Sequence, residues 1–324
     1  MVKLLESVKE AHALKAGQVT TAKDASYEDI VQSLTNALGE GWLDTETLTS
    51  LLDEAEIAGR QHVCLFTVDE ADSPAVQTSL ATPRTLNDKP TELEEFWKIP
   101  LEPYTRILPP RGGHTLSKII AVRKYWVDID RVTQPDYKKV EQKREKERAA
   151  MIVKFSPMSR LLQFRVPIKE QAPGVDTSKS VYEFIADLVQ SQYGDPGIEW
   201  LLRLKPLKIG DAFQKIVQNR EDFQLHTDHP ENKHFKSSMS KKGAPELGKD
   251  IRDYTEWVYE SGFARSCIRG IWGKEGEPKV DVRMNYEQVK VSKTLTRPVA
   301  RLYFAKPYCD EDVEHVIRRI RDHF

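Results

Sequence analysis

Basic side chains that could bind phosphate recur along the predicted strands near the C-terminus. Alternate residues of a strand point to the same face, so Arg265 and Arg269 are expected to lie together on a strand over 264–272. If the following strands are in register, their basic residues share this face and form a positive platform that tracks a phosphate backbone. The candidate residues of the platform are Arg265, Arg269, Arg283, Lys290, Lys293 and Arg301. The alternative is an ordinary solvated sheet face whose Lys and Arg residues protect its edges.

A run of charge lies further towards the N-terminus. Nine of the eleven residues from Lys138 to Arg148 are charged, six of them basic and three acidic. Oppositely charged pairs at i,i+3, such as Glu141 and Arg144, favour a helix here. The run could be a basic arm that enters a groove or lies on phosphates, or a solvated helix or mobile loop between strands. Its candidate nucleic-acid contacts are Lys138, Lys139, Lys143 and Arg144.

Three of the eight histidines, His226, His229 and His234, lie within nine residues. Histidine and carboxylate clusters can hold Zn²⁺ or another transition metal, and these are weak metal candidates. No cysteine is near, and the spacing matches no zinc signature, which favours a polar loop. We therefore predict no metal site and no cofactor.

The remaining motifs give no catalytic residue. The segment 110–118 is superficially similar to a phosphate loop, but it lacks the Gly-Lys-Ser/Thr ending and leads into a strand, which favours a Gly-Gly turn. Asp281, Glu287 and Lys290 form a metal-nuclease triad only if the spacing is relaxed. The nucleophile elbow, the kinase motifs and the dinucleotide fingerprint are absent from the sequence. The sequence leans towards a protein that is not an enzyme.

Charge is segregated along the chain. Residues 1–102 carry 8 Lys and Arg against 19 Asp and Glu, a net of −11. Residues 103–324 carry 41 against 31, a net of +10, although the whole chain has a net charge of only −1. A basic body with an acidic end predicts an anionic partner for one part and a different contact for the other.

The bulk composition is that of a folded protein. Hydrophobic residues make up 39% of the chain, and six Trp, eleven Tyr and eleven Phe can build cores. Three distant cysteines suggest neither a disulfide framework nor a metal site, which fits a reducing compartment. No apolar stretch of 18 residues occurs, so we expect no membrane insertion and a location in the cytoplasm, or in the nucleus of a eukaryote.

Periodicity and end signals outline the elements that position these residues. Helices are predicted near 4–11, 26–38, 44–58, 181–193, 211–217, 251–258 and 310–320, with Asp44, Asp211 and Asp310 as caps, and a further helix is predicted to start at Asp195–Pro196. Strands are predicted at 62–68, 119–129, 151–155, 161–166, 264–272, 280–286, 289–295 and 299–303. The polar segment 221–250 shows no periodicity and is predicted to be a loop.

The predicted fold class is α+β. A small acidic helical domain (1–68) is followed by a Pro-rich linker (69–110) and a larger basic mixed domain (111–324), with an antiparallel sheet, a C-terminal helix and a further boundary near 175. The predicted function is non-catalytic binding of nucleic acid, DNA before RNA, through the phosphate backbone, with the acidic domain contacting a protein partner or another copy. The alternatives are a scaffold subunit of a multi-component assembly and a metal-dependent nuclease.

Overall fold

The computed structural model contains two compact units, which are described separately. The structure describes residues 27–41, 43–87, 100–134, 137–168, 177–219, 221–231, 239–240, 264–273, 279–290 and 296–324. The N-terminal unit comprises Met1–Ala58 with Asp88–Lys98, and the sheet unit comprises Gly59–Asn87 with Ile99–Phe324. The predicted helices near 4–11 and 251–258 lie outside the described residues.

Two helices make up the described part of the N-terminal unit, α2 (Tyr27–Gly39) and α3 (Thr45–Ala58). The backbone N–H and the hydroxyl of Thr47 donate hydrogen bonds of 2.6 and 2.9 Å to the Asp44 carboxylate, which confirms Asp44 as the cap of α3. Leu34 and Leu48, which lie on the apolar stripes of the predicted helices, are buried, and so is Ile57.

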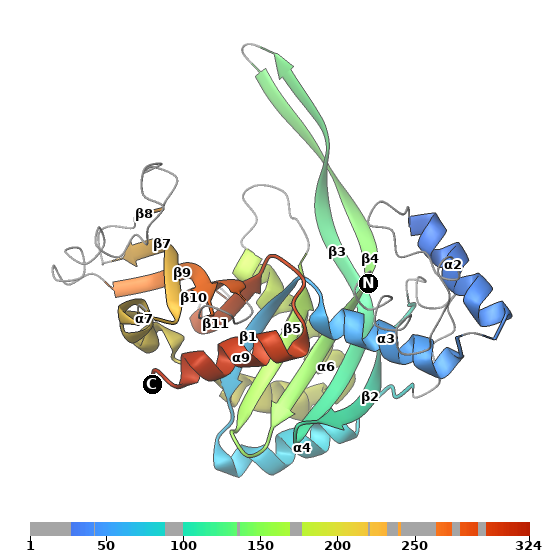
Figure 1. Cartoon of the computed structure of the whole chain (residues 1–324), viewed down its shortest axis with the longest axis horizontal. Coiled ribbons are helices and arrows are strands. Elements are labelled where there is room, and N and C mark those ends of the chain that lie inside the picture. The colour runs from blue at the N-terminus through green and yellow to red at the C-terminus, as the bar shows by residue number, and fades with distance from the viewer. Residues whose placement is uncertain are drawn as a thin grey trace. The chain divides into compact units, whose positions relative to one another are not determined.

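One antiparallel sheet dominates the sheet unit (Figure 1). Its described strands follow the spatial order β2-β3-β4-β5-β1-β11-β10-β9-β7-β8, with β6 paired to β1. The strands are β1 (Gln61–Thr67), β2 (Tyr104–Arg111), β3 (His114–Gln134), β4 (Tyr137–Ser156), β5 (Leu161–Pro167), β6 (Lys205–Pro206), β7 (Phe223–Glu231), β8 (Met239–Ser240), β9 (Ala264–Trp272), β10 (Val280–Lys290) and β11 (Thr296–Phe304). This arrangement confirms the predicted α+β class with an antiparallel sheet and a C-terminal helix.

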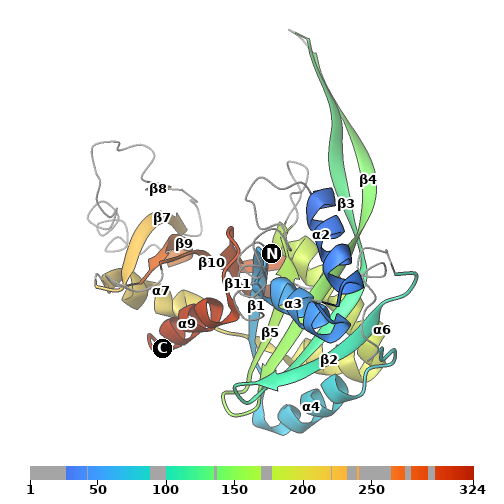
Figure 2. The same cartoon turned by 45° about the vertical axis from the view of Figure 1, so that its right-hand side comes forward.

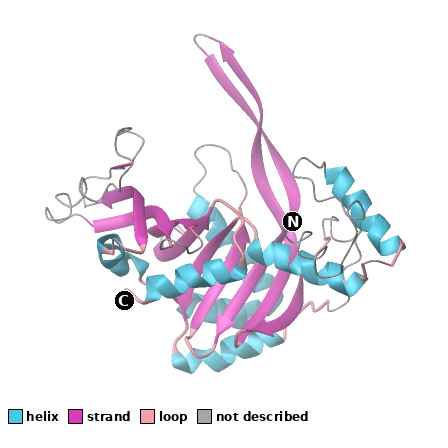
Figure 3. Ribbon diagram, in the orientation of Figure 1, coloured by secondary structure: helices cyan, strands magenta, loops and turns pink. Residues whose placement is uncertain are grey.

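Helices pack on both faces of the sheet (Figures 1 and 3). The helices are α4 (Ser73–Ala81), preceded by the 3-10 turn Glu70–Asp72, α6 (Thr177–Arg203), α7 (Ile209–Gln218) and α9 (Asp310–Arg321). Apolar residues of α7 and α9 share one core, and residues of α4 and α6 share the other. We call the two sides of the sheet the α9 face and the α6 face. Among the described residues, no helix is both long and apolar enough to cross a lipid bilayer.

Strand β1 shows how the sequence specifies this three-layer arrangement. Val63 and Leu65 belong to the α9-side core, whereas Cys64 and Phe66 belong to the α6-side core. Successive residues of a strand point to opposite faces, so a continuous apolar run fits a strand that is buried on both sides. β1 pairs with β5 on one side and with β11 on the other.

Glycine supplies two backbone conformations that this fold needs. Gly112 and Gly113, with φ of 56° and 78°, form the two-residue turn between β2 and β3, which confirms the Gly-Gly turn. Gly194, with φ of 65°, interrupts α6 just before Pro196, so α6 consists of two helices joined at a kink, as predicted.

The structure corrects several predicted elements. The charged run Lys138–Arg148 lies within strand β4, which is paired with β3 along its length, and does not form a helix or loop. Together these strands form a two-stranded ribbon that extends beyond the rest of the sheet (Figure 2). Tertiary pairing with the apolar strand His114–Gln134 outweighs the weak i,i+3 charge pairs that suggested a helix.

The other corrections concern boundaries and caps. Strand β7 occupies Phe223–Glu231 in the segment predicted to be a loop. β10 continues to Lys290, so the start of the strand predicted over 289–295 belongs to β10, and residues 291–295 lie outside the described ranges. Helix α7 begins after Lys208 and α9 after Cys309, so Asp211 and Asp310 lie in first turns and are not caps. The sequence also did not predict α4, which begins with Pro74 near its N-terminus, a position that proline tolerates.

Candidate nucleic-acid interface

The strand register gathers several basic side chains on the α6 face. Arg269 of β9 is the Cα partner of Arg283 of β10, and Arg283 is the partner of Tyr303 of β11. Arg301 is the partner of Cys64, whose side chain belongs to the α6-side core. Arg269, Arg283, Arg301 and Tyr303 therefore share one side of the sheet, and we call this group the arginine face.

Arg269 is partly neutralised by one carboxylate. Its Nε and Nη2 atoms donate hydrogen bonds of 2.9 and 2.7 Å to the two carboxylate oxygens of Asp281. These bonds raise the pKa of Arg269 above its ordinary value, although burial opposes the rise. The Arg269 side chain is 45% exposed and that of Asp281 only 16%. Of the two partners, the arginine is therefore the more accessible to solvent.

Arg283 is exposed and lies directly beside this pair. Its Nε donates a hydrogen bond of 3.1 Å to the Cys267 sulfur, which in turn lies 3.1 Å from the Asn285 side-chain oxygen. Arg283 forms no ion pair with a residue that the structure describes. Two guanidinium groups directly opposite one another on adjacent strands repel each other, so an anion bound between them would be stabilised.

Arg301 lies deeper than the other two arginines, with 6% of its surface exposed. Its Nη1 is 3.1 Å from the Nδ1 atom of His62, which must accept the hydrogen bond because a guanidinium only donates. Burial lowers the pKa of His62 to about 3, and the charges of Arg301 and Arg123 add to this effect. His62 is therefore neutral, and the exposed part of the arginine face consists of Arg269 and Arg283.

The other predicted contacts are only partly described. The backbones of Arg265 in β9 and Lys290 in β10 are paired with Pro230 and Thr296, but their side chains and all of Lys293 are not described. The remaining candidates, Lys138, Lys139, Lys143 and Arg144, pair along the ribbon with Thr133, Val132, Val127 and Trp126. Their side chains are likewise not described.

The predicted metal and nuclease candidates are not assembled in the described part of the chain. His226 and His229 lie on β7, and His234 lies outside the described residues. No group of three His, Cys, Asp or Glu side chains that could hold a metal ion occurs among the described residues. Asp281 is engaged by Arg269, and a metal would have to break that bidentate pair.

Sequence reasoning missed a second charged cluster, on the α9 face. Lys154 of β4 and Arg165 of β5 are 2% and 1% exposed, and both contact Asp310 and Glu314 of α9. Lys154 Nζ is 2.9 Å from an oxygen of each carboxylate, and Arg165 lies 2.7 Å from Asp310 and 2.6 Å from Glu314. Gln163 donates a further hydrogen bond of 2.9 Å to Glu314. We call these five residues the α9 ion cluster.

The α9 ion cluster is matched in charge, with two cations and two carboxylates. Burial alone would raise the pKa of both carboxyl groups, but Arg165 and Lys154 more than offset this, so the pKa values of Asp310 and Glu314 lie below their ordinary values. The sequence signal was present, because polar residues at 154, 163 and 165 interrupt otherwise apolar strands. Their partners could not be identified, because α9 lies some 150 residues further along the chain.

Comparisons with known proteins do not assign the chain to a family. No protein-family model matches it, and no curated protein sequence is significantly similar to it.

Proposed function

We propose that this protein binds nucleic acid without catalysis, mainly through phosphate contacts at the arginine face. The observation that carries the proposal is the direct opposition of Arg269 and Arg283 on neighbouring strands, both exposed, with Asp281 beside them. Guanidinium groups bind phosphate oxygens through charge-assisted hydrogen bonds. Tyr303, the next residue across the sheet, could add a stacking surface for a base.

The distribution of charge between the two units supports this proposal. The N-terminal unit carries 6 Lys and Arg against 15 Asp and Glu, a net of −9, whereas the sheet unit carries 43 against 35, a net of +8. A basic unit attracts a polyanion over a distance of about the Debye length, roughly 8 Å at physiological salt. The acidic unit would repel nucleic acid, which suits a contact with a protein partner or another copy of the chain.

The β3–β4 ribbon offers a second contact. A two-stranded antiparallel ribbon has the dimensions to enter the major groove of B-DNA, and the positions of Lys138, Lys139, Lys143 and Arg144 lie along it. This favours duplex DNA as the ligand. We expect such a protein to act in the cytoplasm, or in the nucleus of a eukaryotic cell.

The opposite charges of the two units also suit a second function. A scaffold subunit could pair its acidic unit with the basic unit of a neighbouring subunit, head to tail, with no nucleic acid involved. A stoichiometric protein that co-purifies with the chain, or self-association that salt disrupts, would favour this function.

The test is a binding series with duplex DNA, single-stranded DNA and RNA of equal length. Fluorescence anisotropy at about 50 and 200 mM salt should show binding that weakens steeply as salt rises, because each phosphate contact releases counterions. Binding without any cleavage of the probe supports the proposal, and the tightest probe identifies the ligand class. No binding to any of the three at the lower salt concentration would contradict it.

A further inference from the structure

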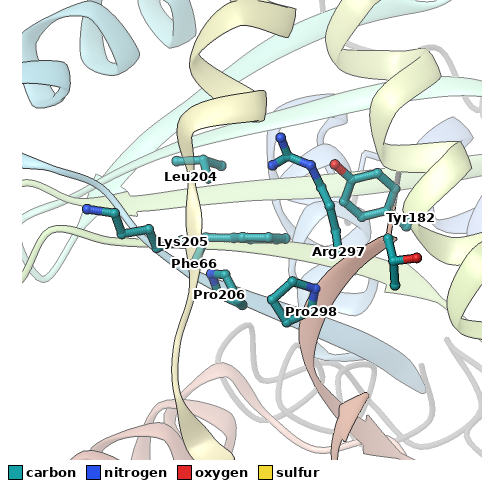
Figure 4. Close-up of a pocket in the computed structure, with 8 residues that line it drawn as sticks. Phe66, Tyr182, Leu204, Lys205, Pro206, Arg297 and Pro298 are labelled. Atoms are coloured by element: carbon teal, nitrogen blue, oxygen red, sulfur yellow. The ribbon is translucent and has the colours of Figure 1, made fainter. Parts of the chain in front are cut away.

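A pocket lies on the α6 face where two strands separate (Figure 4). β11 pairs with β1 only as far as Ala300 and Leu65, and from Phe66 onwards β6 takes its place through Pro206. Pro206 and Pro298 line opposite sides of the resulting gap. Proline has no backbone N–H to extend a sheet, so the ladder cannot close across the gap. The space has a volume of about 240 Å³.

The walls of the pocket are mostly apolar and are held by contacts within the sheet. Leu204 and the two prolines surround the ring of Phe66. Phe66 packs edge-to-face against Phe164, with ring centroids 5.8 Å apart and an interplanar angle of 78°. The strand pair between β1 and β6 and the hydrogen bond of 3.1 Å from the Thr67 hydroxyl to the Lys205 carbonyl hold the wall in place. Such walls can accept a flat apolar group without rearrangement.

Two polar groups face the same space. The Arg297 Nε is buried without a hydrogen-bond partner, and Arg297 forms no ion pair with a described residue. The Tyr182 hydroxyl also forms no hydrogen bond with a residue in the described ranges, and in Figure 4 it points towards the Arg297 guanidinium. Burial raises the pKa of Tyr182, with Arg297 offsetting part of the rise, so the phenol keeps its proton and can donate it.

A buried guanidinium nitrogen without an acceptor is costly, and an oxyanion in the pocket would remove that cost. The nearby Lys205, in contrast, already has a counterion, because its Nζ is 2.8 Å from the Asp69 carboxylate. The pocket therefore has one cation without a counterion among the described residues, one donor hydroxyl and one aromatic face.

We propose that this pocket binds a small ligand that carries a single oxyanion, a carboxylate or phosphate group, on a flat apolar ring. The ring packs against Phe66, and the oxyanion accepts hydrogen bonds from Arg297 and Tyr182. This site goes beyond the proposed function, because it uses none of the residues of the arginine face.

The test uses three probes of similar shape, benzoate, phenyl phosphate and the uncharged benzamide, titrated into the full chain at constant ionic strength. Calorimetry and ligand-induced shifts in melting temperature should show saturable binding of at least one anion and at least about tenfold weaker binding of benzamide. The better of the two anions identifies the oxyanion. No saturable binding of either anion up to about 10 mM, or equal binding of benzamide, would overturn the proposal.

Variants locate the site. Arg297→Gln should weaken anion binding by at least about tenfold and Tyr182→Phe by roughly threefold to tenfold, because a charged hydrogen bond is worth more than a neutral one. Lys205→Gln, at the rim of the same pocket, is the matched control and should leave affinity unchanged. Equal weakening by Lys205→Gln and Arg297→Gln would overturn the assignment. If circular dichroism shows that Arg297→Gln does not fold, Tyr182→Phe decides the question. Nucleic-acid binding by folded Arg297→Gln should be unchanged, which separates this site from the arginine face.

Discussion

The two faces of the central sheet treat charge in opposite ways. On the α9 face, Lys154 and Arg165 are buried, and two carboxylates of α9 match them within 3 Å. On the α6 face, Arg269 has a bidentate partner in Asp281, whereas Arg283 forms no ion pair with a residue that the structure describes. The buried ion pairs of the α9 face hold helix α9 against the sheet. Excess charge of one sign near the surface is available to a ligand.

Arg123, on strand β3, is a further basic residue of the α6 face. It is buried on the α6 face, where Nη1 donates a hydrogen bond of 2.6 Å to the Pro167 carbonyl and the guanidinium lies 5.4 Å from the centre of the Phe184 ring. Burial lowers the pKa of Arg123, and the Glu147 charge only partly opposes this. Arg301 and Arg123 both lower the pKa of His62, so two cations lie near this neutral histidine on the α6 face.

The largest effect should follow from breaking the α9 ion cluster. Glu314→Gln leaves Lys154 and Arg165 buried with one carboxylate, and we expect unfolding to become easier by about 3 kcal/mol. Urea unfolding measures this. Glu311→Gln, an exposed position in the first turn of the same helix, is the matched control.

Restoring the balance sharpens this test. The double variant Lys154→Met/Glu314→Gln removes one charge of each sign and leaves Arg165 with Asp310. It should recover part of the stability that Glu314→Gln loses. A Glu314→Gln protein as stable as Glu311→Gln would show that the cluster does not fasten α9 to the sheet.

The contributions of the two faces to protein stability should be lost in different pH ranges as the solution is acidified. His62 has a pKa of about 3 when folded and 6.5 when unfolded, so the unfolded chain binds the extra proton as pH falls through this window. Between pH 7 and pH 5, the titration of His62 should lower the free energy of unfolding by on the order of 2 kcal/mol. The carboxylates of the α9 ion cluster have lowered pKa values, so their contribution persists above pH 4.5 and is lost as pH falls below their ordinary values of 4.5 and 3.8.

Unfolding of His62→Gln between pH 7 and pH 4 checks this separation. In the variant, the free energy of unfolding should change less between pH 7 and pH 5 than in the wild type. It should still fall steeply below about pH 4.5. His315→Gln on α9 controls for the removal of a histidine. A wild-type stability that does not change between pH 7 and pH 5 would contradict the neutral, buried His62.

A smaller effect is expected from freeing Arg269. Asp281→Asn removes the carboxylate of the arginine face, and a phosphate can then take its place on Arg269. The dependence of log affinity on log salt should steepen by about 0.9 if the variant neutralises one more phosphate. Asp72→Asn, which breaks the 3.0 Å pair with Arg203 elsewhere in the sheet unit, changes net charge equally and should leave the slope unchanged. An equal change in both variants would indicate that only total charge matters.

The elements with strong periodicity could be predicted from the sequence, and those defined by long-range pairing could not. The apolar stripes of α2, α3 and α9 and the apolar run of β1 were visible as local patterns. The charged run was misassigned, because it is a strand only through its pairing with β3. A fragment beginning at residue 103 would lack β1, a strand with neighbours on both sides, so charge variants must be made in the full chain.

The candidate site was predictable in part. The alternation of side chains along a strand predicted that Arg269 lies on an exposed basic face. The structure adds the register, which makes Arg283 its partner on the neighbouring strand. The burial of Arg301 against His62 could not be foreseen, because the two residues are 239 positions apart. Neither could the pocket, whose residues come from β1, β6, β11 and α6.

The central claim is that Arg269 and Arg283 contact phosphate, and the salt dependence of duplex DNA binding tests it most directly. Arg269→Gln/Arg283→Gln should flatten the slope of log affinity against log salt by about 1.8, which is 0.9 for each phosphate that the protein then leaves unneutralised. Arg318→Gln/Arg321→Gln, two exposed arginines in the last turn of α9, is the matched control and should keep the wild-type slope. A folded Arg269→Gln/Arg283→Gln protein with the wild-type slope would contradict the claim and favour the scaffold function.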